Sequence, residues 1–353
     1  MAVPYKFANV NSSQGIPLEW LDADFDYLSS FLNSSAKVVD NIADLASLSP
    51  LDYEFVYIKG YYSPGDGGEG YFYSANSGVA GTYAGNGGTI VVPTGGNGSS
   101  AWLRIYNSSL NVKWFGAIGD GSTNDTTAIQ NAINVGPSVY VPPGTYSIGK
   151  ITVTNSIVLY GDGSSSTTLI SAANVNDNLL YFNSVDKIEV KGLTVDGNKS
   201  QQTSAPVNSG NPIAFLSCSN VYMLDCIFTN GLGNGMITFG GFNFHYEKCY
   251  FTNNDANGTY HTTTAVAVDD GTRNITGTNC VCSNNFYDGF CFDPGSDNCA
   301  LSACLSFSNH GCGFNVFGND SSIFARNVTL VGCIRSEEHT SELQSHLNLV
   351  CRL

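Results

Sequence analysis

The sequence predicts an all-β protein whose main part is a parallel β-helix, that is, a solenoid of stacked coils. Charged residues make up only 12% of the 353-residue chain, about half the usual share in soluble domains. The chain also has 39 glycines, 20 phenylalanines and 19 tyrosines, a composition typical of strands joined by many tight turns. An apolar fraction of 42% argues against disorder. The most specific observation is a repeated spacing of asparagine and cysteine.

Five times in the second half of the chain, an asparagine is followed six positions later by a cysteine. The intervals between successive asparagines are 23, 31, 24 and 29 residues, which are lengths of solenoid coils with loops inserted at the turns. Asp186 and Gly192 occupy the same frame with both anchor residues replaced. The five pairs are Asn220/Cys226, Asn243/Cys249, Asn274/Cys280, Asn298/Cys304 and Asn327/Cys333.

Stacked coils place equivalent residues above one another, about 4.8 Å apart. The cysteines are therefore expected to form an inward column of small apolar side chains, and a linear column offers no tetrahedral metal site. Asparagines four and five residues after each cysteine predict two further columns of stacked amides at a corner. These columns are Asn230, Asn253 and Asn284, and then Asn254, Asn285 and Asn309.

Two smaller parts precede the solenoid. Residues 1–36 are predicted to be a short N-terminal anchor segment, with one amphipathic helix that carries Leu18, Leu21, Phe25 and Leu28. Residues 37–110 are predicted to be a small β-rich head domain, because short aromatic and β-branched runs alternate there with glycine-rich loops.

The solenoid, residues 111–334, is predicted to begin with a capping helix. Asn124 or Asp125 can cap a helix whose apolar face then covers the open end of the first coils. The apolar face consists of Ala128, Ile129, Ala132 and Ile133, and Pro142-Pro143-Gly144 then turns the chain into the first strands.

The segments 114–133 and 139–146 closely resemble the start of the pectate lyase-like β-helix family. Residues 1–36 resemble the N-terminal segment of many phage tail fibres. Together these resemblances imply a right-handed parallel β-helix in a bacteriophage tailspike or tail-fibre protein. They also imply a homotrimer that is attached to the phage tail or baseplate through its N-terminus.

The last nineteen residues, 335–353, differ abruptly from the rest, with no glycine and no aromatic residue. The run from Arg335 to Ser345 resembles an in-frame translation of a sequencing adaptor. We therefore expect an artefactual tail and a natural protein that is longer than the solenoid seen here. An acidic capping helix is the alternative interpretation.

The net charge of −15 argues against binding to nucleic acid, because few basic groups are available to replace phosphate counterions. It likewise argues against anionic membrane surfaces. The N-terminus has no apolar signal-peptide core, and no run approaches the length that spans a bilayer. We expect a protein made in the host cytoplasm and carried on the virion to the bacterial surface, with no membrane insertion.

Two aspartates are the candidate catalytic pair. Asp269 lies five residues before Asn274, and Asp293 lies five residues before Asn298, so both belong to one column on adjacent coils. A separation near one strand spacing suits a retaining glycosidase, in which one carboxyl group is the acid/base and the other the nucleophile. Asp270 is the alternative partner if Asp269 points inward. Ordinary turn chemistry before glycine is the competing interpretation of both aspartates.

The candidate substrate-binding residues surround this column. Arg273 is one of two basic residues near it, with Lys248, and the loop 252–264 is a candidate groove wall. Asp225 and Lys248 are interpreted as an exposed ion pair, and no metal or cofactor is expected. The candidate binding residues are Glu247, Tyr260, His261 and Arg273.

The function expected from the resemblance is binding and depolymerisation of a bacterial surface polysaccharide, by hydrolysis or by a lyase reaction. The sequence does not separate these two reactions. A non-catalytic glycan-binding adhesin or structural tail fibre is the alternative.

Overall fold

The structure is a computed structural model that describes residues 36–107, 109–204, 209–254, 266–269, 271–316 and 325–336. The predicted anchor segment lies outside these ranges, apart from Ala36. The chain divides into two compact units, residues 1–107 and 108–353. None of the helices in the described ranges is long and apolar enough to cross a bilayer.

The first unit is a five-stranded sheet with the order β1-β2-β3-β5-β4. β1 and β2 pair in parallel, and the other neighbours pair antiparallel. Leu45 of helix α2 (Ile42–Ser47) packs with Phe72 and Trp102 in a small core. The strands are β1 (Ala36–Val39), β2 (Phe55–Ile58), β3 (Gly70–Asn76), β4 (Ile90–Val91) and β5 (Ser100–Arg104).

Asp66 organises the loop between β2 and β3. Its carboxylate accepts hydrogen bonds from the backbone N–H groups of Tyr61, Tyr62, Ser63 and Gly68, at 2.7–3.0 Å. Although burial opposes it, these four donors lower the pKa of Asp66 below its ordinary value.

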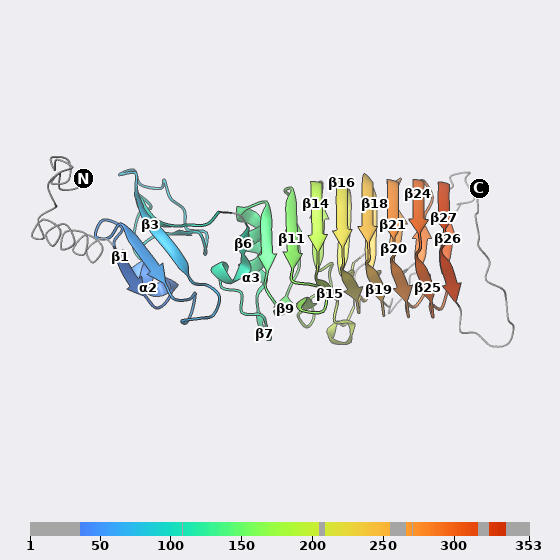
Figure 1. The fold of residues 1–353 in the computed structure, drawn as a ribbon, viewed down its shortest axis with the longest axis horizontal. Coiled ribbons are helices and arrows are strands. Elements are labelled where there is room, and N and C mark those ends of the chain that lie inside the picture. The colour runs from blue at the N-terminus through green and yellow to red at the C-terminus, as the bar shows by residue number, and fades with distance from the viewer. Residues whose placement is uncertain are drawn as a thin grey trace, which may run out of the picture. The chain divides into compact units, whose positions relative to one another are not determined.

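The second unit is the predicted parallel β-helix, in which strands stack coil upon coil from α3 to β27 (Figure 1). The coils from β8 to β26 contribute strands to three faces, and neighbouring strands on each face pair in parallel. The long strands β16 and β18 bend around one corner, so each belongs to both the first and the second face.

The first face contains β10 (Ile151–Val153), β13 (Leu180–Asn183), the start of β16 (Ile213–Leu224) and of β18 (Met236–Glu247), β20 (Val266–Asp269), β23 (Phe290–Phe292) and β26 (Phe314–Val316). The second face contains β6 (Leu110–Asn111), β8 (Ser138–Val141), β11 (Ile157–Gly161), β14 (Asp186–Lys191), the ends of β16 and β18, β21 (Arg273–Thr278), β24 (Asp297–Ser302) and β27 (Arg326–Val331).

The third face contains β7 (Asp120–Asn124), β9 (Gly144–Ile148), β12 (Thr167–Ser171), β15 (Thr194–Asp196), β17 (Ile227–Thr229), β19 (Tyr250–Thr252), β22 (Val281–Ser283), β25 (Leu305–Phe307) and β28 (Ile334–Ser336). The short 3-10 helices are η2 (Val112–Phe115) and η3 (Lys199–Gln201). β28 takes in Arg335 and Ser336, the first two residues of the predicted artefactual tail.

The cysteine column lies inside the coil, as predicted. Cys226, Cys249, Cys280 and Cys304 have no exposed surface, and they belong to one core cluster that runs from Leu110 to Cys304. Burial raises the pKa of Cys249 well above its ordinary value, so its thiol stays protonated and behaves as a small apolar group.

The paired asparagines form an outer amide ladder. From Asn243 onward, each side-chain Nδ2 donates to the Oδ1 of the asparagine one coil earlier, at 2.9 Å for Asn243 to Asn220 and 3.0 Å for Asn274 to Asn243, whereas Asn220 Nδ2 donates to Asp186 Oδ1 at 2.5 Å. Asn298 and Asn327 continue the ladder at 3.3 and 3.1 Å. All five asparagines have φ between 53° and 62°, a left-handed conformation that asparagine tolerates better than most residues.

The predicted extension of this frame to Asp186 and Gly192 is wrong by one position. Asp186 pairs with Ser219 rather than Asn220, so Lys187, with φ 64°, occupies the ladder position. The register follows from burial, because it turns Ile188 inward, whereas the expected frame would turn Lys187 inward instead.

The second predicted amide column is buried. Asn285 Oδ1 accepts from the backbone N–H and the Nδ2 of Asn254, both at 3.1 Å. Its own Nδ2 donates to Asn309 Oδ1 at 2.9 Å and to the Phe251 carbonyl at 3.0 Å. These side chains satisfy turn groups that no water reaches.

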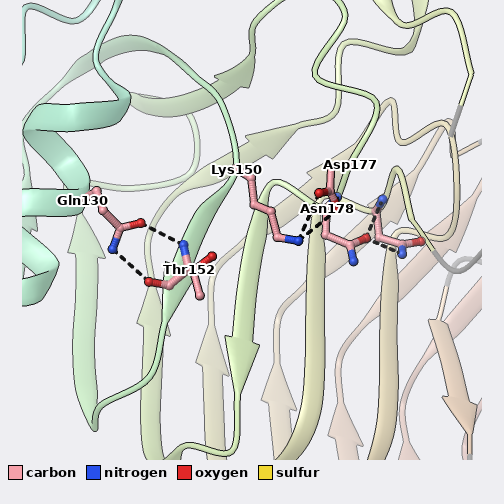
Figure 2. Close-up of polar contacts among 6 residues, drawn as sticks. Gln130, Lys150, Thr152, Asp177 and Asn178 are labelled. Carbon is pink, nitrogen blue, oxygen red and sulfur yellow. Dashed lines mark hydrogen bonds and ion pairs between the residues drawn. The ribbon is translucent and has the colours of Figure 1, made fainter. Parts of the chain in front are cut away.

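Helix α3 (Thr126–Val135) covers the open end of the solenoid, with Ala128, Ile129, Ala132 and Ile133 buried as predicted. Asn124 Oδ1 accepts from Thr126 N at 3.0 Å, whereas the Asp125 carboxylate binds the N–H groups of Ile118 and Gly119. Figure 2 shows Gln130 hydrogen-bonded to both backbone groups of Thr152, at 2.8 and 2.9 Å. The Gln130 amide thereby pairs with backbone groups of β10 that would otherwise need a neighbouring strand.

Candidate functional site

The two candidate aspartates lie on adjacent coils at the corner between the first and second faces. β20 and β23 pair with Val268 opposite Phe292, so Asp269 and Asp293 are the next pair in register. Val268 and Phe292 are completely buried in the core, so the pleat turns both aspartates outward. Both are half-buried. Asp270 lies outside the described residues.

The two aspartates begin turns of the same design. Asp269 O accepts from Thr272 N at 3.3 Å, and Asp293 O accepts from Ser296 N at 3.1 Å. Gly271 and Gly295 supply the positive φ angles of 77° and 92° that these turns require. The turns thus close through main-chain carbonyl oxygens.

A buried thiol lies beside this pair. Cys291 Sγ is 3.5 Å from Asp293 Oδ1, and Cys291 is 1% exposed. Burial, followed by the charges of Asp293, Asp288 and Asp269, raises the pKa of the Cys291 thiol. The thiol therefore stays protonated and donates to Asp293, which stabilises negative charge on that carboxylate.

Asp288 is a nearby carboxylate that the sequence reasoning missed. It belongs to a third polar ladder, formed by the residues two positions before β13, β16, β18 and β23. Asn178 Oδ1 accepts from Asn211 N at 3.2 Å, Asn211 Oδ1 accepts from Asn234 N at 2.6 Å, and Asp288 Oδ1 accepts from Cys312 N at 2.5 Å. Figure 2 shows the start of this ladder at Asn178, next to the Lys150–Asp177 ion pair. Asp288 is therefore part of the architecture.

A groove of about 430 Å³ lies at the same corner. It is lined by Gly240 and Gly241, which carry no side chains, and by Phe242, which is 49% exposed. Arg273, a predicted binding residue, also lines it. Asp297, in register with Arg273, pairs instead with Arg326 at 3.6 Å. Gly271 and Asn274 complete the lining.

The structure separates Glu247 from this corner groove. Glu247 ends β18, eight residues beyond Phe239, which is in register with Asp269. It contacts Tyr222 and Lys248 instead, with Lys248 Nζ 3.5 Å from Glu247 Oε1. The interpretation of Lys248 as a partner of Asp225 is therefore wrong, because the neighbouring carboxylate is closer. Tyr260 and His261 lie outside the described residues.

Glu247 belongs to a row of outward side chains that the sequence reasoning did not connect. Tyr222 stacks on His245 with ring centroids 5.4 Å apart and planes 7° from parallel. The Tyr222 hydroxyl lies 3.4 Å from Glu247 Oε2, and His245 Nδ1 lies 2.6 Å from Thr276 Oγ1. We call this row the second-face strip; it consists of Tyr140, Tyr160, Glu189, Lys191, Tyr222, His245, Glu247 and Thr276. Only strand register could have revealed it.

Chemically, the corner offers two outward carboxyl groups one strand spacing apart, a cationic side chain and an exposed ring beside an open groove. Within the ranges that the structure describes, no three His, Cys, Asp or Glu side chains converge to hold a metal ion. The arrangement suits acid–base and nucleophilic chemistry on a ligand that lies along the corner.

The coils and the corner define a parallel β-helix protein with an outward acidic site. The family described as rhamnogalacturonase A/epimerase, pectate lyase-like, matches residues 109–336. The chain therefore belongs to this pectate lyase-like family, whose fold is the right-handed parallel β-helix, as the resemblance implied. A phage tail protein small four-stranded β-sheet domain matches residues 38–107.

The relatives include phage appendage and tail spike proteins and also mannuronan C5-epimerases of Azotobacter vinelandii, one of which is 32% identical over 109 residues, 26% of this chain and 6% of that protein. The chain is 28% identical over 155 residues to the pre-neck appendage protein of Bacillus phage phi29, covering 40% of this chain and 18% of that protein. It is 31% identical over 138 residues to the tail spike protein of Escherichia virus K5, covering 39% and 21%. The chain thus matches about a fifth of the length of these two curated phage relatives.

The fold is also similar to that of a tailspike protein of Acinetobacter baumannii bacteriophage Fri1, described as a capsular polysaccharide depolymerase. The TM-score is 0.53 at 15% identity, and the match covers 87% of this chain and 64% of that chain. At this identity the likeness concerns the fold alone.

Proposed function

We propose that this chain is a phage tailspike subunit that binds and depolymerises a bacterial surface polysaccharide. The observation that carries the proposal is the outward pair Asp269 and Asp293 on adjacent coils beside the corner groove. The tail spike relative and the phage-tail domain of the first unit support a place on the virion tail. Attachment to the tail or baseplate would fall to the N-terminal residues 1–36.

The reaction that best fits the pair is retaining glycoside hydrolysis. Register separates the two aspartates by one strand spacing, about 4.8 Å, close to the ~5–5.5 Å between the carboxyl groups of retaining enzymes. Asp293, stabilised as a carboxylate by the Cys291 thiol, attacks the anomeric carbon. Asp269 protonates the leaving oxygen and then takes a proton from the water that hydrolyses the glycosyl-enzyme. Arg273 and Phe242 hold the sugar in the groove.

The decisive experiment measures release of reducing ends from a panel of capsular and O-antigen polysaccharides. Asp269→Asn and Asp293→Asn are expected to abolish release, whereas the matched control Asp225→Asn retains it, because Asp225 lies at another corner with φ 52°. Release that persists in both variants would remove the pair from the mechanism. Products with a new carbon–carbon double bond would replace hydrolysis by a lyase reaction.

A second candidate, a non-catalytic adhesin, is favoured by the shared turn design around Asp269 and Asp293, because aspartate before glycine is common in turns. Binding of a polysaccharide with no release from any polymer of the panel would support it over the depolymerase.

The subunit is proposed to act as a homotrimer. Light scattering of the purified protein is expected to give three times the chain mass of 37.5 kDa. A monomer at working concentration would contradict this part of the proposal.

A further inference from the structure

The second-face strip runs along the solenoid axis over consecutive strands, β8, β11, β14, β16, β18 and β21. Two rows of outward positions form it. Glu189, Tyr222, His245 and Thr276 are in register in one row. Tyr140, Tyr160, Lys191 and Glu247 belong to the other row, in which Leu224 lies between Lys191 and Glu247. Five coil steps of ~4.8 Å make the strip about 24 Å long.

The side chains of the strip fix one another. Lys191 Nζ lies 2.5 Å from Glu189 Oε2 and 5.8 Å from the centre of the Tyr222 ring. Tyr140 and Tyr160 have ring centroids 5.3 Å apart, and the Tyr140 hydroxyl donates to Asp162. With the Tyr222–His245 stack, these contacts hold long side chains in place before any ligand arrives, which lowers the entropic cost of binding.

The strip stops where the later coils begin. In the same two rows, β24 and β27 carry Ala300, Ser302, Thr329 and Val331, with no ring and no charge. Rings and charges are therefore concentrated on one stretch of an otherwise repetitive face. The stretch adjoins the corner groove without sharing its lining residues, because Phe242 and Asn274 of that lining precede His245 and Thr276 by three and two residues, within ~10 Å along the strands.

The chemistry of the strip favours a carbohydrate over a protein partner. Its charged groups are mutually paired, Lys191 with Glu189 and Lys248 with Glu247, which suits a ligand rich in hydroxyl groups. The central part of a protein interface is depleted in charge, whereas Lys191, Glu189 and Glu247 lie at the middle of this surface and remain 31–40% exposed.

We propose that the second-face strip is a non-catalytic subsite that binds a stretch of polysaccharide lengthwise, parallel to the solenoid axis. The ligand is a glycan segment of several sugars, hydrogen-bonded by Glu189, Glu247 and Thr276 and packed against the edges of Tyr160, Tyr222 and His245. This proposal rests on the proposed function in taking the ligand as the same surface polysaccharide. It assigns residues beyond the groove lining, which retain the polymer while the corner groove acts on it.

The test uses the full chain with Asp293→Asn, so that binding is measured without cleavage. The probe is each purified polysaccharide of the panel, titrated by calorimetry. Tyr222→Ala and His245→Ala are each expected to weaken binding about tenfold, whereas the matched control Thr329→Ala, in the same row beyond the strip, leaves it unchanged. Tyr222→Phe, which keeps the ring, is expected to retain most of the affinity. Unfolding temperatures exclude global destabilisation.

A second readout separates this proposal from the proposed function. In the chain with Asp293 intact, Tyr222→Ala is expected to raise KM for long polymer without changing kcat on short oligosaccharides. Polymer binding that responds to the strip in the absence of any cleavage would support the strip and overturn the depolymerase. Unchanged affinity in both alanine variants would overturn the strip. A changed oligomer mass in them would identify the face as an interface between subunits and also overturn it.

Discussion

At the residue scale, asparagine performs two tasks that depend only on its place in the coil. Asn274 in the outer ladder is exposed and adopts φ 56°, so what it contributes is mainly tolerance of a left-handed backbone. Asn285 in the inner ladder is 1% exposed and holds hydrogen bonds to three residues of neighbouring turns. Asparagine is therefore expected to contribute more to the free energy of unfolding in the inner ladder than in the outer one.

We expect Asn285→Ala to lower the free energy of unfolding by about 3 kcal/mol, because buried backbone and amide groups lose their partners. Asn274→Ala, its matched control, should cost only about 1 kcal/mol for left-handed backbone strain. Denaturant unfolding of the two variants measures both. Equal losses would contradict the distinction between the ladders.

The thiol of Cys291 is a positioning group in the proposed mechanism. Cys291→Ala removes its hydrogen bond to Asp293, so the carboxylate loses stabilisation and the acidic limb of the pH–activity profile should move to higher pH. A weak hydrogen bond corresponds to a displacement of about half a pH unit.

Cys291→Ser, whose hydroxyl can donate in the same place, should restore the original profile. A purely structural role predicts lower stability with an unmoved profile in the alanine variant, and would refute the positioning role.

Asp66 makes the first unit sensitive to acid. Its folded-state pKa lies below the ordinary value, so its contribution to stability is complete above the ordinary aspartate pKa, near 4. That contribution is lost as pH falls through the lowered folded-state value. Asp66→Asn keeps one acceptor oxygen and does not titrate, so it should lower stability at neutral pH and flatten the acid dependence. Thermal unfolding between neutral and acidic pH checks both effects, and a variant with the parent's acid dependence would contradict them.

At the scale of elements, α3 protects the first coil in two ways. Its apolar face covers the core, and Gln130 satisfies the exposed edge of β10. An uncovered strand edge is otherwise open to pairing with other chains. The cap thus buries the apolar end of the core and also supplies, through the Gln130 amide, the hydrogen bonds that a neighbouring strand would make.

Gln130→Ala should lower the free energy of unfolding by about 1–3 kcal/mol, because it leaves both backbone groups of Thr152 without a protein partner. Thr127→Ala, on the exposed side of the same helix, is the control and should have little effect. Denaturant unfolding compares them, and a loss equal to that of the control would show that water replaces the amide at no cost.

At the scale of the whole solenoid, the strands of each described coil pair only with those of adjacent coils, so stability should behave largely as a sum of local terms. Gln130 and Asn285 are separated by several coils. The double variant Gln130→Ala/Asn285→Ala is therefore expected to lose the sum of the two single losses, within about 0.5 kcal/mol. A coupling above ~1 kcal/mol, measured in the same denaturant series, would indicate that distant coils unfold as one unit.

Much of this fold follows from sequence alone, because a solenoid repeats its spacing in the chain. The cysteine column, the asparagine frame that accompanies it, the buried column of Asn254, Asn285 and Asn309, and the apolar face of α3 could each be predicted from fixed intervals. The column of Asp269 and Asp293 followed from the same frame. At Asp186 the predicted frame is wrong by one position, because it treats this polar residue as the equivalent of the repeated asparagine. The register of this strand follows instead from the burial of Ile188.

Tertiary structure decided what the coil spacing does not encode. The sequence by itself determined the all-β composition, the coil frame and the column of the two aspartates. The fold decided that this pair lies beside a groove with Arg273, that Glu247 lies on another face with Tyr222, and that Asp288 belongs to a ladder. The physical reason is that a frame fixes which residues stack along the axis, whereas neighbours across a corner depend on strand length and on where the backbone bends.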